Sequence, residues 1–155
     1  MSKYDASMDR DANRQVITGN DSFKLSSEWT FVGNATGDQA AHTLFTVTGD
    51  VLVRVFGVCS TNIAGAGTME VGVAGNTAGI IAQIADATNL DAGEVWVDAT
   101  PGVGAEALPS TFIVAGGADI ILTIGTADLT AGVVTFYCLW RPLSLDGAVS
   151  VTTPA

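Results

Sequence analysis

The stretch DIILTIGTADLTAGVVTFYCLWRPLS, residues 119–144, predicts the architecture of the whole chain. From 118 to 126, every second side chain is apolar: Ala118, Ile120, Leu122 and Ile124. After a polar break, the alternation resumes with Val134, Phe136, Cys138 and Trp140. Because alternate residues of a strand share one face, both runs predict strands with one face in a core. We therefore predict an antiparallel β-hairpin that ends at Pro142, which has no backbone N–H to donate.

The rest of the chain has the same pattern of short apolar runs separated by Gly, Asn, Asp and Pro. Turn residues at a spacing of about ten residues are typical of β-sandwiches and barrels. We predict an all-β, antiparallel, jelly-roll-like β-sandwich in a single domain, residues 23–155. Its strands are expected near 23–32, 43–48, 51–59, 68–74, 79–85, 94–98, 110–115, 118–126, 132–141 and 148–152.

Residues 1–22 differ from the predicted domain. They are rich in Asp, Asn, Arg and Ser and have no strand periodicity. We predict an extended N-terminal arm, either disordered or ordered against a partner.

Two predicted strands are apolar on both faces. On the second face of 132–141, Val133, Tyr137 and Leu139 precede Arg141. The segment 51–59 behaves alike, with valines on one face and three apolar residues around one arginine on the other: Leu52, Arg54, Phe56 and Val58. Such strands need cover on both sides, and we predict that another subunit covers the second one.

The charge of the chain limits its partners. Its formal net charge is −10, only 14% of its residues are charged, and no lysine follows Lys24. Ordinary soluble domains have about 25% charged residues. Nucleic acid and anionic membranes both require Lys and Arg, so we predict neither as a partner. No apolar run is long enough for a transmembrane helix, and the polar N-terminus does not resemble a signal peptide, so we expect synthesis in a cytoplasm.

Residues capable of catalysis are few, and we predict that the chain is not an enzyme and binds no cofactor. His42, the one histidine, precedes a predicted strand and accompanies no nucleophile motif. Cys59 and Cys138 fall inside predicted strands, where buried thiols and a disulfide both remain open. The acidic loop 86–94 lacks the spacing of a calcium-binding EF-hand, and we predict turns there rather than a metal site.

The tryptophans and the second strand face supply candidate interface residues. Trp140 lies on the predicted core face, whereas Trp96 alternates with Glu94 and Asp98 and is the best candidate for an exposed aromatic. Exposed aromatic residues commonly anchor protein interfaces. The predicted interface consists of Trp96, Tyr137, Leu139 and Arg141, with the arginine offered to a carboxylate.

Three segments resemble small structural proteins of tailed-phage virions: LFTVTGDVLVRVFGVCST (44–61), TMEVGVAGNTAGIIAQ (68–83) and ADIILTIGTADLTAGVVTFYCLWRPLS (118–144). The resemblance spans most of the body, and its most specific part is the ending FYCLWRPLS. It implies a virion component, and we expect a capsid decoration, or cement, protein on the virion exterior, with the major capsid protein as partner. We expect a homotrimer. The alternative is a carbohydrate- or receptor-binding tail module, which would need a groove with exposed aromatic residues and carboxylates.

Overall fold

The computed structural model describes residues 23–154, and the predicted arm at 1–22 lies outside them. The described chain consists of strands joined by turns and one short 3-10 helix. In chain order these elements are β2 (Phe23–Thr30), β3 (Ala41–Thr48), β4 (Val51–Ala64), β5 (Thr68–Val73), β6 (Asn76–Ile84), η1 (Ala87–Asn89), β7 (Glu94–Trp96), β8 (Gly102–Val103), β9 (Phe112–Val114), β10 (Ile120–Gly125), β11 (Ala131–Pro142) and β12 (Ala148–Val151).

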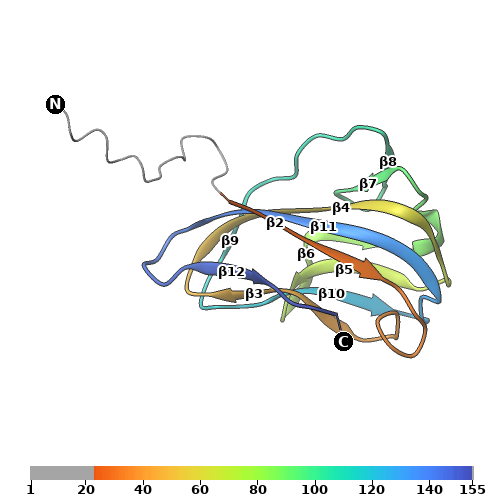
Figure 1. Cartoon of the computed structure of the whole chain (residues 1–155), viewed down its shortest axis with the longest axis horizontal. Coiled ribbons are helices and arrows are strands. Elements are labelled where there is room, and N and C mark those ends of the chain that lie inside the picture. The colour runs from red at the N-terminus through yellow and green to blue at the C-terminus, as the bar shows by residue number, and fades with distance from the viewer. Residues whose placement is uncertain (1–22, 155) are drawn as a thin grey trace.

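The strands form two sheets stacked as layers, with the order β12-β3-β10-β5-β6 in one and β2-β11-β4-β7-β8 in the other (Figure 1). β9 also pairs with β4 in the second sheet. Every strand pair from β2 to β12 is antiparallel. This arrangement confirms the predicted all-β, antiparallel sandwich.

The core lies between the sheets and is built from the alternating faces that the sequence predicted. β10 contributes Ile120, Leu122 and Ile124, and each is at most 1% exposed. β11 contributes the fully buried Val134, Phe136 and Cys138. Because successive strand residues point to opposite faces, the intervening residues of both strands point away from this core.

The predicted hairpin between β10 and β11 is wrong. β10 pairs with β3 and β5, whereas β11 pairs with β2 and β4 in the other sheet. The connection 126–130 therefore crosses the end of the sandwich, with Leu129 fully buried and its N–H donating to the Gly37 carbonyl at 2.7 Å. The apolar faces of β10 and β11 belong to opposite layers of one core. The alternation of apolar residues is the same whether two strands pair in a hairpin or face each other across a core, so it does not distinguish the two cases.

The turn between β3 and β4 also joins the two sheets, at Gly49 and Asp50. Gly49 has a φ of +61°, and a Cβ there would lie 2.5 Å from Ser144 Oγ, so the corner requires glycine. The Asp50 carboxylate accepts a hydrogen bond from the Gly116 N–H at 2.8 Å. This bond ties the corner to the neighbouring turn that leads from β9 to β10.

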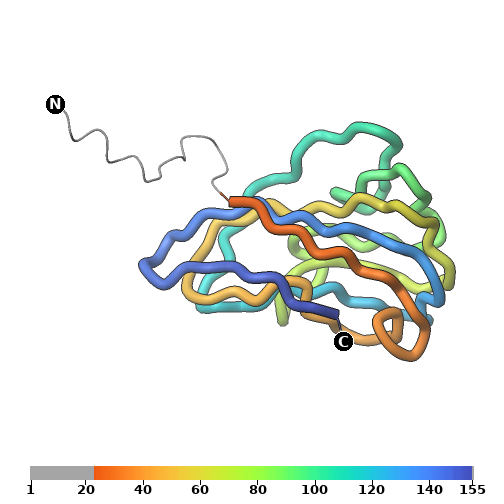
Figure 2. The backbone as a smooth tube through the Cα atoms, in the orientation of Figure 1, coloured from red at the N-terminus to blue at the C-terminus, as the bar shows by residue number. Residues whose placement is uncertain are grey.

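One edge of β4 carries two separate strands. β7 pairs with residues 57 and 58 of β4, and β9 pairs with residues 51–53. Between them, residues 97–111 form β8, which extends the sheet beyond β7, and then return to β4 at β9. Figure 2 shows this segment arching away from the two layers. We call residues 97–111 the β7–β9 loop.

Replacing Leu129 by alanine tests the crossing connection. We expect Leu129→Ala to lower the free energy of unfolding by about 3 kcal/mol, because it leaves a cavity at the end of the core. Leu145→Ala is the matched control, since Leu145 is fully exposed, and it should change stability by less than about 0.5 kcal/mol. Urea unfolding measures both. Equal effects of the two substitutions would contradict a buried crossing.

Candidate functional site

The side chains of β2, β11 and β4 that point away from the core form one surface, which we call the outer face. Its β11 members include Tyr137 and Leu139, which are half-buried, and Arg141, which is exposed. Its β4 members are half-buried as well: Leu52, Arg54, Phe56 and Val58. The prediction of strands with two apolar faces is therefore confirmed, while cover by another subunit remains a prediction.

Strand register brings the predicted interface residues of β11 together with matching residues of β4. Tyr137 lies opposite Phe56, and their rings stack at a centroid distance of 5.2 Å and an interplanar angle of 19°. Leu139 lies opposite Arg54, and the next outward pair is Arg141 with Leu52. Directly opposed side chains of neighbouring strands are in contact range, so these pairs form a continuous aromatic, aliphatic and cationic stripe.

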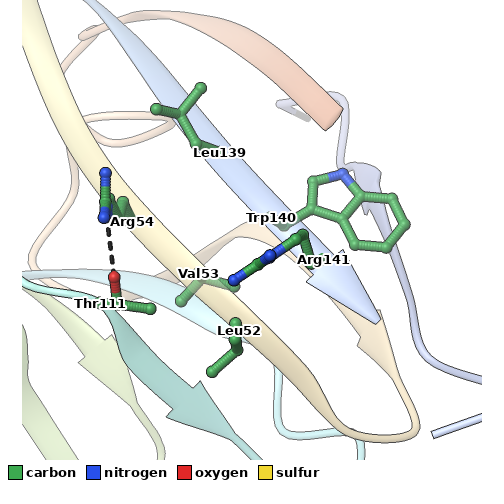
Figure 3. A pocket seen from close by; sticks show the side chains of 7 residues that line it. All are labelled: Leu52, Val53, Arg54, Thr111, Leu139, Trp140 and Arg141. Atoms are coloured by element: carbon green, nitrogen blue, oxygen red, sulfur yellow. Dashed lines mark hydrogen bonds between the residues drawn. The ribbon is translucent and has the colours of Figure 1, made fainter. Parts of the chain in front are cut away.

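A small pocket lies at the cationic end of this stripe (Figure 3). Arg54, Arg141, Leu139 and Thr111 are among its lining residues, and its volume is about 20 Å³. The Arg54 Nε–H donates to Thr111 Oγ1 at 2.9 Å, which fixes the guanidinium beside β9. The pocket has room for one water-sized group, such as a carboxylate oxygen.

The prediction that Trp96 is an exposed anchor is wrong, because its side chain is 0% exposed. In the β4–β7 pair, Trp96 lies opposite Gly57, a core-facing position without a side chain. The indole packs edge-to-face on Phe136, with a centroid distance of 6.0 Å. The space in front of Gly57 is occupied by the side chains of Val134 and Phe136, so this glycine permits the close packing of the β11 core residues.

The other two tryptophans also belong to the interior. Trp29 is 3% exposed, and its indole N–H donates to the Thr36 carbonyl at 2.8 Å. Trp140 packs against the core as predicted and stacks on the half-exposed Phe23 at 4.7 Å.

The β7–β9 loop encloses two grooves that the sequence analysis did not predict. One, of about 460 Å³, lies between the loop and β6, and Asp98, Glu106 and Phe112 are among its lining residues. The other, of about 240 Å³, lies between residues 104–109 of the loop and the Phe56 end of the outer face. The loop thus covers part of the outer face and leaves the Leu139 end accessible. The run of Gly, Ala and Pro residues was the sequence feature that could have indicated a loop projecting from the sheet.

His42 has a structural environment. Its Nε2 lies 3.1 Å from both the backbone carbonyl oxygen and Oδ1 of Asp38, and its ring packs edge-to-face on Trp29 at 5.5 Å. These contacts join the start of β3 to the loop that precedes it. The imidazole therefore links this loop to the core through Asp38 and Trp29.

The acidic loop 86–94 uses its oxygens on its own backbone. Asp86 caps η1 and accepts hydrogen bonds from the Thr88 N–H and hydroxyl at 3.0 and 2.7 Å, which lower the pKa of its carboxyl. The Glu94 carboxylate accepts from the Asp91 N–H at 2.7 Å. Residues 23–154 contain no group of three or more His, Cys, Asp or Glu arranged to hold a metal ion.

Both cysteines are free thiols on the core faces of β4 and β11. Cys59 lies opposite Val134, four residues from Cys138 along β11, which rules out a disulfide between them. Burial raises the pKa of Cys138 to about 12 and also raises the pKa of Cys59. Buried, protonated thiols are inert, so both cysteines act as small apolar core residues.

No protein family model, curated protein or solved structure matches the chain. Nor does any helix of residues 23–154 have the length and apolar character needed to cross a membrane. The function is therefore inferred from the residues and their geometry.

The Cys138 pKa predicts a change in stability at alkaline pH. The folded-state pKa of about 12 exceeds the ordinary value of 9.0, so the stabilisation is complete below pH 9 and is lost as the pH rises towards 12. We expect the free energy of unfolding to fall with a slope of up to about 1.4 kcal/mol per pH unit in this window. Cys138→Ala should give a shallower slope in urea unfolding between pH 9 and 11. Parallel slopes for both proteins would show that the thiol does not cause the loss.

Proposed function

We propose that this chain is a non-enzymatic structural protein of a tailed-phage virion, made in the host cytoplasm and bound to the outside of the capsid as a decoration, or cement, protein. The observation that carries the proposal is the outer face of β11 and β4. Its aromatic and aliphatic side chains are half-buried in a single chain, and the β7–β9 loop covers only part of them. A partner that covers the rest would remove further apolar surface from water.

The order of the strands supports a jelly-roll interpretation of the sandwich. Four strands run β2-β11-β4-β7 in one sheet, opposite β3-β10-β5-β6 in the other. Consecutive strands mostly change sheet, and β5–β6 is a hairpin within one layer. We interpret this connectivity as two interlocked Greek keys, a topology common in viral capsid proteins and also in lectins. It therefore supports both the virion proposal and its alternative.

A cement protein acts by making separation of shell subunits more costly. If the outer face spans the boundary between two major capsid protein subunits, the subunits cannot move apart without exposing that surface again. Apolar burial contributes about 25 cal/mol per Å², less the cost of association. A standard interface of about 800 Å² per partner, repeated over the shell, is enough to stabilise the head.

The proposal is tested on heads from a phage that lacks the gene for this chain. We expect the purified full-length protein to sediment with these heads at a fixed number of copies per shell subunit. The decorated heads should also retain their DNA at higher temperature. A protein that does not bind the heads at micromolar concentration would overturn the proposal.

Substitutions in the outer face test which surface is used. Tyr137→Ser combined with Leu139→Ser should weaken head binding by about 30-fold or more, because central aromatic and aliphatic residues dominate interface energies. Leu145→Ser combined with Val151→Ser is the matched control, since both side chains are exposed away from the outer face. Circular dichroism verifies that each variant is folded. Equal binding by the two variants would exclude the outer face.

We further propose that the protein is a homotrimer. Its charged fraction of 14% is low for a monomer of 15.8 kDa, and closed symmetry would cover additional surface. Light scattering should give a mass three times 15.8 kDa that does not fall on dilution. A mass of 15.8 kDa would reject the trimer while leaving binding to the shell open.

A second function, carbohydrate or receptor binding on the tail, is favoured by the larger groove beside β6. Two carboxylates, Asp98 and Glu106, and the half-buried Phe112 are among its lining residues. A glycan array with and without calcium tests this alternative. Binding that is lost in Asp98→Asn together with Glu106→Gln would favour it over the cement proposal.

A further inference from the structure

The basic residues of the domain are concentrated at one place. Residues 23–155 contain twelve acidic side chains and three basic ones, Lys24, Arg54 and Arg141. All three belong to the same sheet, and their strand positions place them on its outer face. They surround Leu139, and we call Lys24, Arg54, Leu139 and Arg141 the cationic cluster.

Strand register fixes the geometry of the cationic cluster. Leu139 of β11 lies between Lys24 of β2 and Arg54 of β4, and it pairs with both. Since neighbouring strands are about 4.8 Å apart, Lys24 and Arg54 start about 10 Å from each other on either side of the leucine. Arg141 is diagonal to Arg54, at a Cα distance of about 7–8 Å.

The cluster gives this part of the outer face a charge opposite to that of the domain as a whole, which contains twelve acidic side chains. Glu28, which shares the outward positions of β2, lies four residues from Lys24, or about 13 Å along the strand. Three cations around an accessible leucine are complementary to an anionic ligand that also carries an apolar group.

We infer that the cationic cluster binds an acidic segment of a partner protein, in which carboxylates flank an apolar side chain of about the size of leucine. The planar guanidinium of Arg141 suits a carboxylate, which it can bind through two parallel hydrogen bonds. The pocket of about 20 Å³ between the two arginines accepts one oxygen-sized group. Leu139 would pack on the apolar side chain between the carboxylates.

A local carboxylate motif fits this surface better than a polyanion. Three basic and twelve acidic side chains give the domain a formal charge of −9, so a long anionic polymer would extend from the cluster onto repelling surface. Screening confines the attraction of the cluster to about 8 Å at physiological salt. The inference rests on the proposed function, because it names the chemistry by which the outer face would recognise the shell protein.

An NMR titration of the full-length, ¹⁵N-labelled protein tests this inference with three probes. These are acetyl-Asp-Leu-Asp-amide, its uncharged analogue acetyl-Asn-Leu-Asn-amide, and inorganic phosphate. We expect the acidic peptide to shift the amide signals of Lys24, Arg54 and Arg141 with an affinity of about millimolar, and the other two probes to leave them unchanged. Equal shifts with phosphate would reveal a general anion site and overturn the inference, as would shifts confined to other parts of the protein.

Two double variants with the same net charge distinguish the effect of the cationic cluster from that of overall charge. Lys24→Gln with Arg141→Gln, and Ala74→Glu with Ser150→Glu, each lower the net charge by two. Ala74, in the β5–β6 turn, and Ser150, in β12, are both exposed and belong to the opposite layer. Only the first pair should weaken peptide binding, by about tenfold, and slow association with the depleted heads. If the first pair binds heads as the wild type does, the inference fails and the proposed function stands. If the wild type does not bind heads, the proposed function fails, and the peptide titration still decides the inference.

Discussion

β4 and β11 pair along nearly their whole lengths, from Pro142 opposite Val51 to Ala131 opposite Ala64. Three other strands of this sheet attach to one of these two, β2 to β11 and both β7 and β9 to β4, and β8 in turn pairs with β7. One side of the ladder supplies Val134, Phe136 and Cys138 to the core, and its other side forms the outer face. A change of register by one residue would exchange these two sides, so core packing and surface chemistry are set together.

The outer face differs from the rest of the surface in both polarity and charge. Its Phe56–Tyr137 end is partly covered by the β7–β9 loop, whereas its Leu139 end is accessible and carries the cationic cluster. Apolar surface provides affinity, and charges of one sign provide orientation and a faster encounter with an acidic partner. In the proposed function, one face therefore supplies both the energy and the selectivity for the shell, and the acidic remainder of the surface keeps the domain soluble.

Strand positions and buried faces could be predicted from the sequence because alternation has an unambiguous physical cause. Ile120, Leu122 and Ile124 are buried as expected. Alternation does not specify a neighbour, however, and so β10 and β11 were assigned to one hairpin although they lie in opposite sheets. Trp96 was misassigned because a strand of three residues has too few positions to define its inner side. The grouping of Lys24 with Arg54 depends on the register of three strands that are distant in sequence, which no local pattern encodes.

Hydroxyl-radical footprinting of the protein, free in solution and bound to purified heads, tests most directly whether the outer face contacts the shell. We expect Tyr137, Leu139 and Leu52 to lose most of their reactivity on binding, since a partner would exclude water from them. Leu145 and Val151, which are exposed elsewhere, should keep theirs. Unchanged reactivity of Tyr137 and Leu139 in the bound protein would contradict the assignment of the outer face as the binding surface.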